Sequence, residues 1–140
     1  MAAPALVDTG ALVAATDSRS RAHALMRRQM QDYPGSLIVP VTVLPEADYL
    51  VQIRLGVRVE LELLRSLAST DFQIEHLTAS DLTRSITLIE RYADAGIGLV
   101  DASLVAIAER LGIEAIFTLD HRHFRMVRPR HCPAFTILPD

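Results

Sequence analysis

Short apolar runs alternate along the chain with longer segments whose hydrophobic residues recur at helical spacing. The runs that we predict to be strands are 5–7, 36–40, 72–77, 114–119 and 134–138. The segments with a helical period are 9–15, 19–32, 42–55, 57–68, 78–93 and 99–111. Strands that are apolar throughout and alternate with helices indicate a parallel sheet covered on both faces. We therefore expect an α/β protein with three layers.

Local signals mark where several of these helices begin and end. Thr42 and Thr78 stand at predicted starts and can cap the helices that follow them. Gly56 and Gly112 stand at predicted ends. The sequence contains no internal repeat, low-complexity tract or linker, so we expect residues 1–140 to form one domain.

Composition narrows the class of protein. Half of the 140 residues are hydrophobic, which is enough for a sizeable core. No apolar stretch is long enough to span a membrane, and the N-terminal residues have no secretory signal pattern. Cys132 is the single cysteine, so no internal disulfide can form. We expect a cytoplasmic protein.

The cationic residues are all arginine. The chain has 14 of them and no lysine, which argues against P-loop nucleotide hydrolysis and excludes Schiff-base chemistry on lysine. The net charge of −3 argues against a protein that coats nucleic acid by bulk attraction. Arginine and histidine nevertheless gather in 121–131 without an acid between them. This segment is either a solvated surface or a patch that attracts phosphate.

Four acidic residues follow predicted strands or stand near predicted helix starts: Asp8, Glu46, Asp101 and Asp120. Taken singly, each has a structural explanation. An Asp at a helix start is a favoured N-cap, worth about 1 kcal/mol. A Glu in the first turn of a helix interacts favourably with the helix dipole.

Taken together, the four acids suggest a metal site. The carboxyl ends of parallel strands meet at one edge of the sheet, where sites form in α/β folds. Carboxylates that crowd this edge would repel one another unless a divalent cation neutralised them. Oxygen ligands favour Mg²⁺ or Mn²⁺ over Zn²⁺. Such an ion suits hydrolysis of phosphodiester bonds, because it activates water and stabilises charge on the leaving oxygen.

The motifs that contain these acids resemble those of a known family. "LVDTGALVA", "PEADYL", "GLVDASLVAIAERLG" and "TLDHRHF" are similar, in order and spacing, to the acidic motifs of PIN-domain proteins. The small VapC toxins of bacterial toxin–antitoxin pairs are the most similar members. The resemblance covers nearly the whole chain. It implies a PIN-like fold, with a parallel sheet of about five strands between helices.

The resemblance also implies a function and roles for individual residues. It implies an endoribonuclease that depends on Mg²⁺ or Mn²⁺, acts on RNA, forms homodimers and is neutralised by a VapB-type antitoxin. Asp8, Asp101 and Asp120 match the metal ligands, and Glu46 matches the acid that helps to position the attacking water. Thr9 matches a supporting hydroxyl residue.

The sequence differs from the family pattern at one position, and it offers further candidate residues near the motifs. Gly10 stands where many relatives have serine, which removes a second hydroxyl group. Asp94 precedes the third motif and is a candidate fifth acid. Arg122 and Arg125 are candidates for phosphate contacts. For the two histidines beside Asp120, His121 and His123, we expect a surface or RNA-facing role and no zinc site, while Phe124 is expected to anchor the turn in the core.

Two other functions are compatible with the same motifs. One is a PIN nuclease of RNA processing that has no antitoxin, and the other is a module that binds RNA or protein without cleavage. The complete set of four acids disfavours the second of these. The helices predicted at 42–55 and 57–68 are either partner surfaces or ordinary core.

Overall fold

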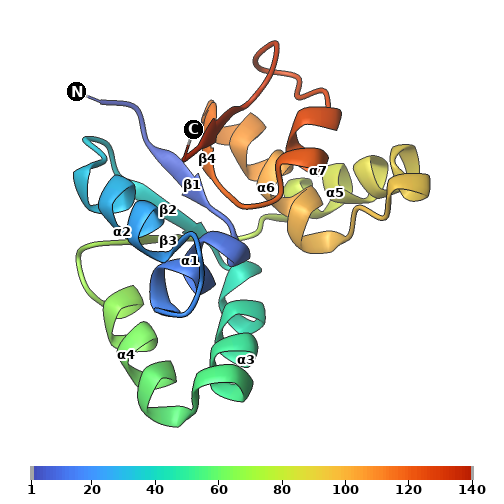
Figure 1. Ribbon diagram of the computed structural model, residues 1–140. Helices are drawn as coiled ribbons and strands as arrows, with labels where there is room; N and C mark the ends of the chain where they lie inside the picture. The colour runs from blue at the N-terminus through green and yellow to red at the C-terminus, as the bar shows by residue number, and fades with distance from the viewer. Residues whose placement is uncertain (1, 140) are drawn as a thin grey trace.

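The computed structural model describes residues 2–139 and contains one parallel sheet with helices packed around it (Figure 1). The strands are β1 (Ala5–Val7), β2 (Leu37–Pro40), β3 (Gln73–Glu75), β4 (Ala115–Phe117) and β5 (Thr136–Leu138). Their order across the sheet is β3-β2-β1-β4-β5, and every neighbouring pair is parallel. The predicted α/β class and the five-stranded parallel sheet are confirmed.

In the part of the chain that the structure describes, seven α-helices and one short 3₁₀ segment connect the strands. They are α1 (Thr9–Thr16), α2 (His23–Asp32), α3 (Val43–Leu55), α4 (Val57–Ala68), α5 (Ala79–Arg91), η1 (Ala93–Ala95), α6 (Leu99–Leu111) and α7 (His121–Met126). No helix within residues 2–139 is both long and apolar enough to cross a membrane.

One predicted helix start was wrong, and one predicted capping bond is absent. Helix α2 begins at His23 and not at residue 19, because Asp17 accepts a hydrogen bond from the Arg19 N–H and holds that segment in a turn. Thr42 makes no side-chain capping bond, since its hydroxyl lies 2.6 Å from the Ser103 hydroxyl on α6. Thr78 caps α5 as expected, in a reciprocal capping box with Asp81.

The α3–α4 pair projects from the sheet as a helical hairpin, at the bottom of Figure 1. Gly56 joins the two helices with φ of 88°, a left-handed value that favours glycine. Along the inner side of the hairpin, Ala47, Val51 and Leu63 are buried. These helices therefore contribute residues to the core and also project beyond the sheet.

The register of the central strands determines where the polar residues emerge. Val7 at the end of β1 is paired with Phe117 at the end of β4, and all residues of β1 are fully buried. The Asp8 N–H continues this pairing with a 2.9 Å hydrogen bond to the Phe117 carbonyl. The residues that follow the two strands, Asp8 and Thr118, therefore leave the sheet at the same edge.

Candidate metal centre

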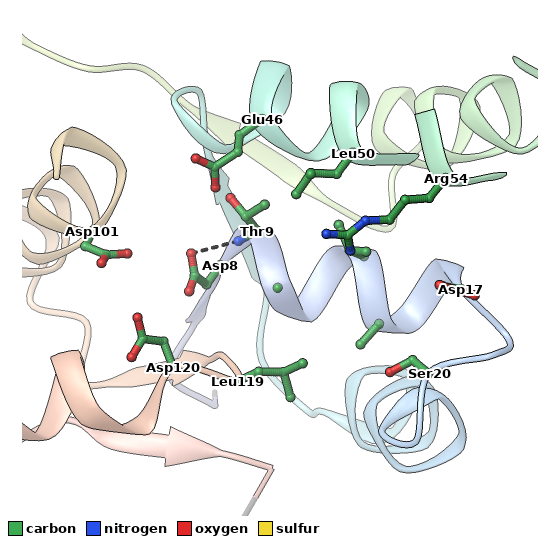
Figure 2. Close-up of a pocket in the computed structure, with 13 residues that line it drawn as sticks. Asp8, Thr9, Asp17, Ser20, Glu46, Leu50, Arg54, Asp101, Leu119 and Asp120 are labelled. Carbon is green, nitrogen blue, oxygen red and sulfur yellow. Dashed lines mark hydrogen bonds between the residues drawn. The ribbon is translucent and has the colours of Figure 1, made fainter. Parts of the chain in front are cut away.

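A cavity of about 580 Å³ opens at the carboxyl edge of the sheet, and all four predicted acids line it (Figure 2). Asp8 follows β1, Glu46 lies in the first turn of α3, Asp101 lies in the first turn of α6, and Asp120 caps α7. The fold thus brings together side chains from four segments that are far apart in the sequence.

Asp8 is the most deeply buried of the four, with 6% of its surface exposed. Its Oδ1 accepts a 2.7 Å hydrogen bond from the Thr9 N–H, and its Oδ2 accepts a 2.7 Å hydrogen bond from the Thr118 hydroxyl. Burial raises the pKa of Asp8 to about 6, although these two bonds oppose the shift. The negative charges of Asp101 and Asp120 add to the increase.

His123 connects Asp101 with Asp120. Its Nδ1 lies 2.8 Å from Oδ2 of Asp101, in a hydrogen bond, and 2.7 Å from Oδ2 of Asp120. Its Nε2 lies 3.0 Å from the Ala95 carbonyl, which can only accept, so Nε2 carries a proton. Burial acts to lower the pKa of His123, but the bonds to Asp101 and Ala95 and the nearby carboxylates outweigh it and raise the pKa.

These contacts correct two expectations. Asp101 is not an N-cap: Gly98 occupies that position, and the Asp101 carboxylate faces the cavity. His123 is not a surface residue, because only 19% of its side chain is exposed and both ring nitrogens have partners. The sequence held a local signal for this, since an Asp at the N-cap and a His three residues later lie on the same side of a helix.

Burial is also the main cause that raises the pKa of Asp101. The hydrogen bond from His123 opposes this increase, while the charges of Asp120 and Glu46 add to it. Glu46 itself is exposed at the rim of the cavity. The acids therefore influence one another through space, as expected for carboxylates that share one cavity.

Two hydroxyl contacts that the sequence did not reveal link the segments that carry the acids. The Thr118 hydroxyl, besides donating to Asp8, accepts a 2.9 Å hydrogen bond from the Asp120 N–H. The Ser103 hydroxyl donates to the Val100 carbonyl at 2.7 Å, which leaves Thr42 as the donor in the Thr42–Ser103 bond. The first bond links β1 to the start of α7, and the second links α3 to α6.

The residues at this site fit a divalent cation. Single ligand atoms of Asp101, Asp120 and His123 lie within 4.8 Å of one another. Within residues 2–139 no arginine forms an ion pair with Asp8, Asp101 or Asp120. The buried Thr9 hydroxyl has no hydrogen-bond partner. A bound cation would compensate the carboxylate charges, and a water in its shell could satisfy this hydroxyl.

The other residues singled out from the sequence lie outside the acidic cluster. Arg122 and Arg125 are exposed on α7, and Asp94 is exposed on η1; none of them lines the cavity. Phe124 is 1% exposed, which confirms that it anchors α7 in the core. Gly10 lines the cavity, and a Cβ there would lie 3.6 Å from the Leu119 side chain, an ordinary contact.

Comparison with known proteins gives consistent results. The model of the PIN domain family matches residues 5–129. Ribonuclease VapC26 of Mycobacterium tuberculosis is 35% identical over 134 residues, which cover 96% of this chain and 99% of that protein. The family match spans the four acids of the cavity.

Solved structures share the fold at lower identity. VapC20 of Mycobacterium tuberculosis, named as a sarcin–ricin loop cleaving toxin, superposes with a TM-score of 0.78 at 24% identity, over 84% of this chain and 91% of that one. A toxin–antitoxin complex from Klebsiella pneumoniae superposes with a TM-score of 0.70 at 19% identity, over 94% and 99% of the two chains.

Proposed function

Because the chain belongs to the PIN-domain family, as a VapC-type ribonuclease toxin of a VapBC toxin–antitoxin system, we propose that its acidic cavity is a metal-dependent endoribonuclease site. The observation that carries this proposal is the convergence of Asp8, Glu46, Asp101 and Asp120 in one cavity, where no arginine within residues 2–139 forms an ion pair with any of them. The ion is Mg²⁺ or Mn²⁺, since most of the available ligand atoms are carboxylate oxygens.

In this proposal each acid has a distinct role. Asp8, Asp101 and Asp120 hold the ion, which would lower the pKa of a bound water and stabilise charge on the phosphate. Glu46 faces the ligands from the exposed rim, where solvent reaches it, and it orients the attacking water. Thr9 supports the site through its buried hydroxyl.

The exposed Arg122 and Arg125 on α7 support a role in substrate binding. They are exposed on α7, the helix that Asp120 caps at the cavity. We propose that they contact RNA phosphates outside the cavity itself. Arginine is suited to this because its planar group binds phosphate through two parallel hydrogen bonds.

Protein partners follow from the same family membership. We propose that the toxin is a homodimer that meets a VapB-type antitoxin in the cytoplasm. The α3–α4 hairpin is the surface that we assign to the antitoxin, because Tyr49, Ile53 and Val57 are 57–61% exposed there. Large apolar side chains that cluster on a surface commonly mark a protein interface.

Substitution of Asp101 tests the proposed activity. Because Asp101 is not a cap, Asp101→Asn removes a charge without changing a helix start. We expect it to abolish Mn²⁺-dependent cleavage of total RNA and growth arrest on expression, with an unchanged circular dichroism spectrum. Asp94→Asn, the same chemical change at an exposed residue outside the cavity, should remain active.

An RNA hairpin with the sarcin–ricin loop sequence is the first defined substrate to test, because VapC20 is named for cleaving that loop. Cleavage of total RNA without cleavage of the hairpin would indicate a different target. An active and toxic Asp101→Asn variant would overturn the proposed metal site.

A further inference from the structure

The cavity continues past the acids as a groove between α1 and α3 (Figure 2). The residues that line this extension are Gly10, Val13, Ala14, Asp17, Ser20, Leu50, Arg54 and Leu119. The proposed reaction does not use any of them. The groove has an acidic end, an apolar middle and a far end that contains Arg54.

Helix α3 forms one wall, with three residues spaced four apart: Glu46, Leu50 and Arg54. Residues at this spacing lie on the same face of a helix, and Figure 2 shows all three side chains directed toward α1. Eight residues separate Glu46 from Arg54, which corresponds to about 12 Å along the helix axis. The backbone of Arg54 therefore lies well beyond the acidic cluster, and Figure 2 shows its side chain extending back toward Leu50, so that the guanidinium lies between the acidic cluster and Asp17.

Within residues 2–139 the Arg54 guanidinium forms no ion pair and donates no hydrogen bond, although its charge acts on Asp17 across the groove. Asp17 is the acid on the opposite wall, and it is already engaged. Its carboxylate accepts hydrogen bonds from the Arg19 backbone N–H at 2.9 Å and from Nε of Arg19 at 3.1 Å. These bonds to Arg19 are the main cause that lowers the pKa of Asp17, and the charge of Arg54 makes a smaller contribution in the same direction. Two guanidinium groups and one carboxylate leave this end of the groove with a net positive charge.

The middle of the groove offers apolar surface. Val13 and Ala14 of α1 are buried beneath it, Leu50 is half-buried on the α3 wall, and Leu119 is 47% exposed at the edge. Gly10 has no side chain, which leaves room in the groove beside Leu119. Such a surface suits the flat face of a base or the carbon atoms of a ribose.

We propose that this groove binds a single RNA strand, with Arg54 holding a phosphate that flanks the one at the acidic cluster. The inference rests on the proposed ribonuclease function and adds a second anchoring point for the same substrate. A strand with a phosphate at each end and a base between them matches the order of acidic site, apolar middle and cation. A bidentate guanidinium contact would also set the register of the strand, and therefore which bond is cut.

Binding measurements with matched variants test this assignment. We would titrate wild type, Arg54→Gln, Arg54→Lys and Arg58→Gln with a fluorescein-labelled random-sequence RNA of eight nucleotides, in CaCl₂ and over a series of KCl concentrations. Arg58 is the control: it lies on α4, its side chain is 92% exposed, and it does not line the groove. Arg54→Gln and Arg58→Gln change the net charge equally.

For Arg54→Gln we expect weaker binding and a salt dependence whose log–log slope is smaller by about 0.7, the value for one phosphate contact on a single strand. Arg54→Lys should keep this slope but bind more weakly than wild type, because lysine lacks the planar fork. Arg58→Gln should match wild type. In cleavage assays, Arg54→Gln should raise KM more than it lowers kcat. An unchanged melting temperature would show that the effect is not one of folding.

Equal RNA affinity and equal slope for Arg54→Gln and wild type would overturn the proposal, as would failure of wild type to bind the RNA. A loss of affinity for a hexaglutamate peptide without a loss for RNA would assign the groove to an acidic protein segment instead. The binding assay does not require cleavage. Wild type that binds RNA through Arg54 but never cuts it would contradict the proposed activity and leave the groove assignment standing.

Discussion

The hydroxyl group of Thr118 donates a 2.7 Å hydrogen bond to Oδ2 of Asp8, although 110 residues separate the two in the chain. The same oxygen accepts the Asp120 N–H at 2.9 Å, and Thr118 is fully buried. One side chain from the end of β4 therefore holds the acid that follows β1 and also the backbone of the acid that caps α7.

Replacement of Thr118 by valine should destabilise the protein by about 1–3 kcal/mol. The variant keeps the shape of the side chain but leaves a buried carboxylate oxygen and a backbone N–H without partners. Urea denaturation in EDTA would measure the loss. Thr118→Ser retains the hydroxyl and should recover most of it, whereas a Thr118→Val protein as stable as wild type would show that this bond contributes little.

Replacement of His123 by alanine should weaken the binding of Mn²⁺ by about 10- to 100-fold, the range found when a residue that orients metal ligands is removed. His123 aligns Oδ2 of both Asp101 and Asp120, so without it the two carboxylates would have to be ordered by the ion itself. Titration of free Mn²⁺ by electron paramagnetic resonance measures affinity independently of cleavage. His121→Ala, a neighbour on the same helix, should bind Mn²⁺ like wild type; equal affinity in both variants would contradict the role of His123.

The pKa of Asp8 predicts how stability of the metal-free protein changes with pH. The folded pKa of about 6 lies above the ordinary aspartate pKa of 3.8, so the native state holds the proton more tightly than the unfolded state. The contribution of Asp8 to the free energy of unfolding therefore falls as pH rises from about 4 to about 6, by roughly 3 kcal/mol in all, and stays low above that range.

Asp8→Asn should remove this contribution. The difference in stability between Asp8→Asn and wild type, measured by urea denaturation in EDTA, should grow in favour of the variant across the same pH range and then level off. Asp94→Asn serves as the control with the same charge change. Saturating Mn²⁺ should reverse the order at pH 7.5, because the ion stabilises only the protein that binds it. A pH-independent difference would show that Asp8 ionises without penalty.

The sequence predicted correctly those helices and strands whose bounds depend on local residue patterns. Helix α4 runs over 57–68 as predicted, because its apolar period is strong and Gly56 marks its start. The start of α2 was predicted too early. The Asp17 side chain accepts the Arg19 backbone N–H and so stabilises a turn in place of the first helical residues, which the apolar period does not reveal. Predictions thus failed where a single polar side chain outweighed a pattern.

For the cavity, the sequence indicated which acids converge but not what holds them. Asp8 and Asp120 were recognisable because each follows an apolar strand. Thr118 looked like one polar residue in an apolar run, and Arg54 like an ordinary basic residue near a helix end. Their relevance depends on the register of β1 against β4 and on the packing of α1 against α3, which are relations between distant segments.

The position of Asp120 in the chain has a consequence for how this protein is made. The acidic cavity needs β4 and the start of α7, which lie in the last quarter of the sequence, beside β1 from its beginning. Synthesis proceeds from the N-terminus. A nascent chain that has emerged only as far as α4 therefore lacks Asp101 and Asp120, half of its acidic cluster. The ribonuclease would become harmful to the cell that makes it only as translation nears completion, when an antitoxin already present could capture it.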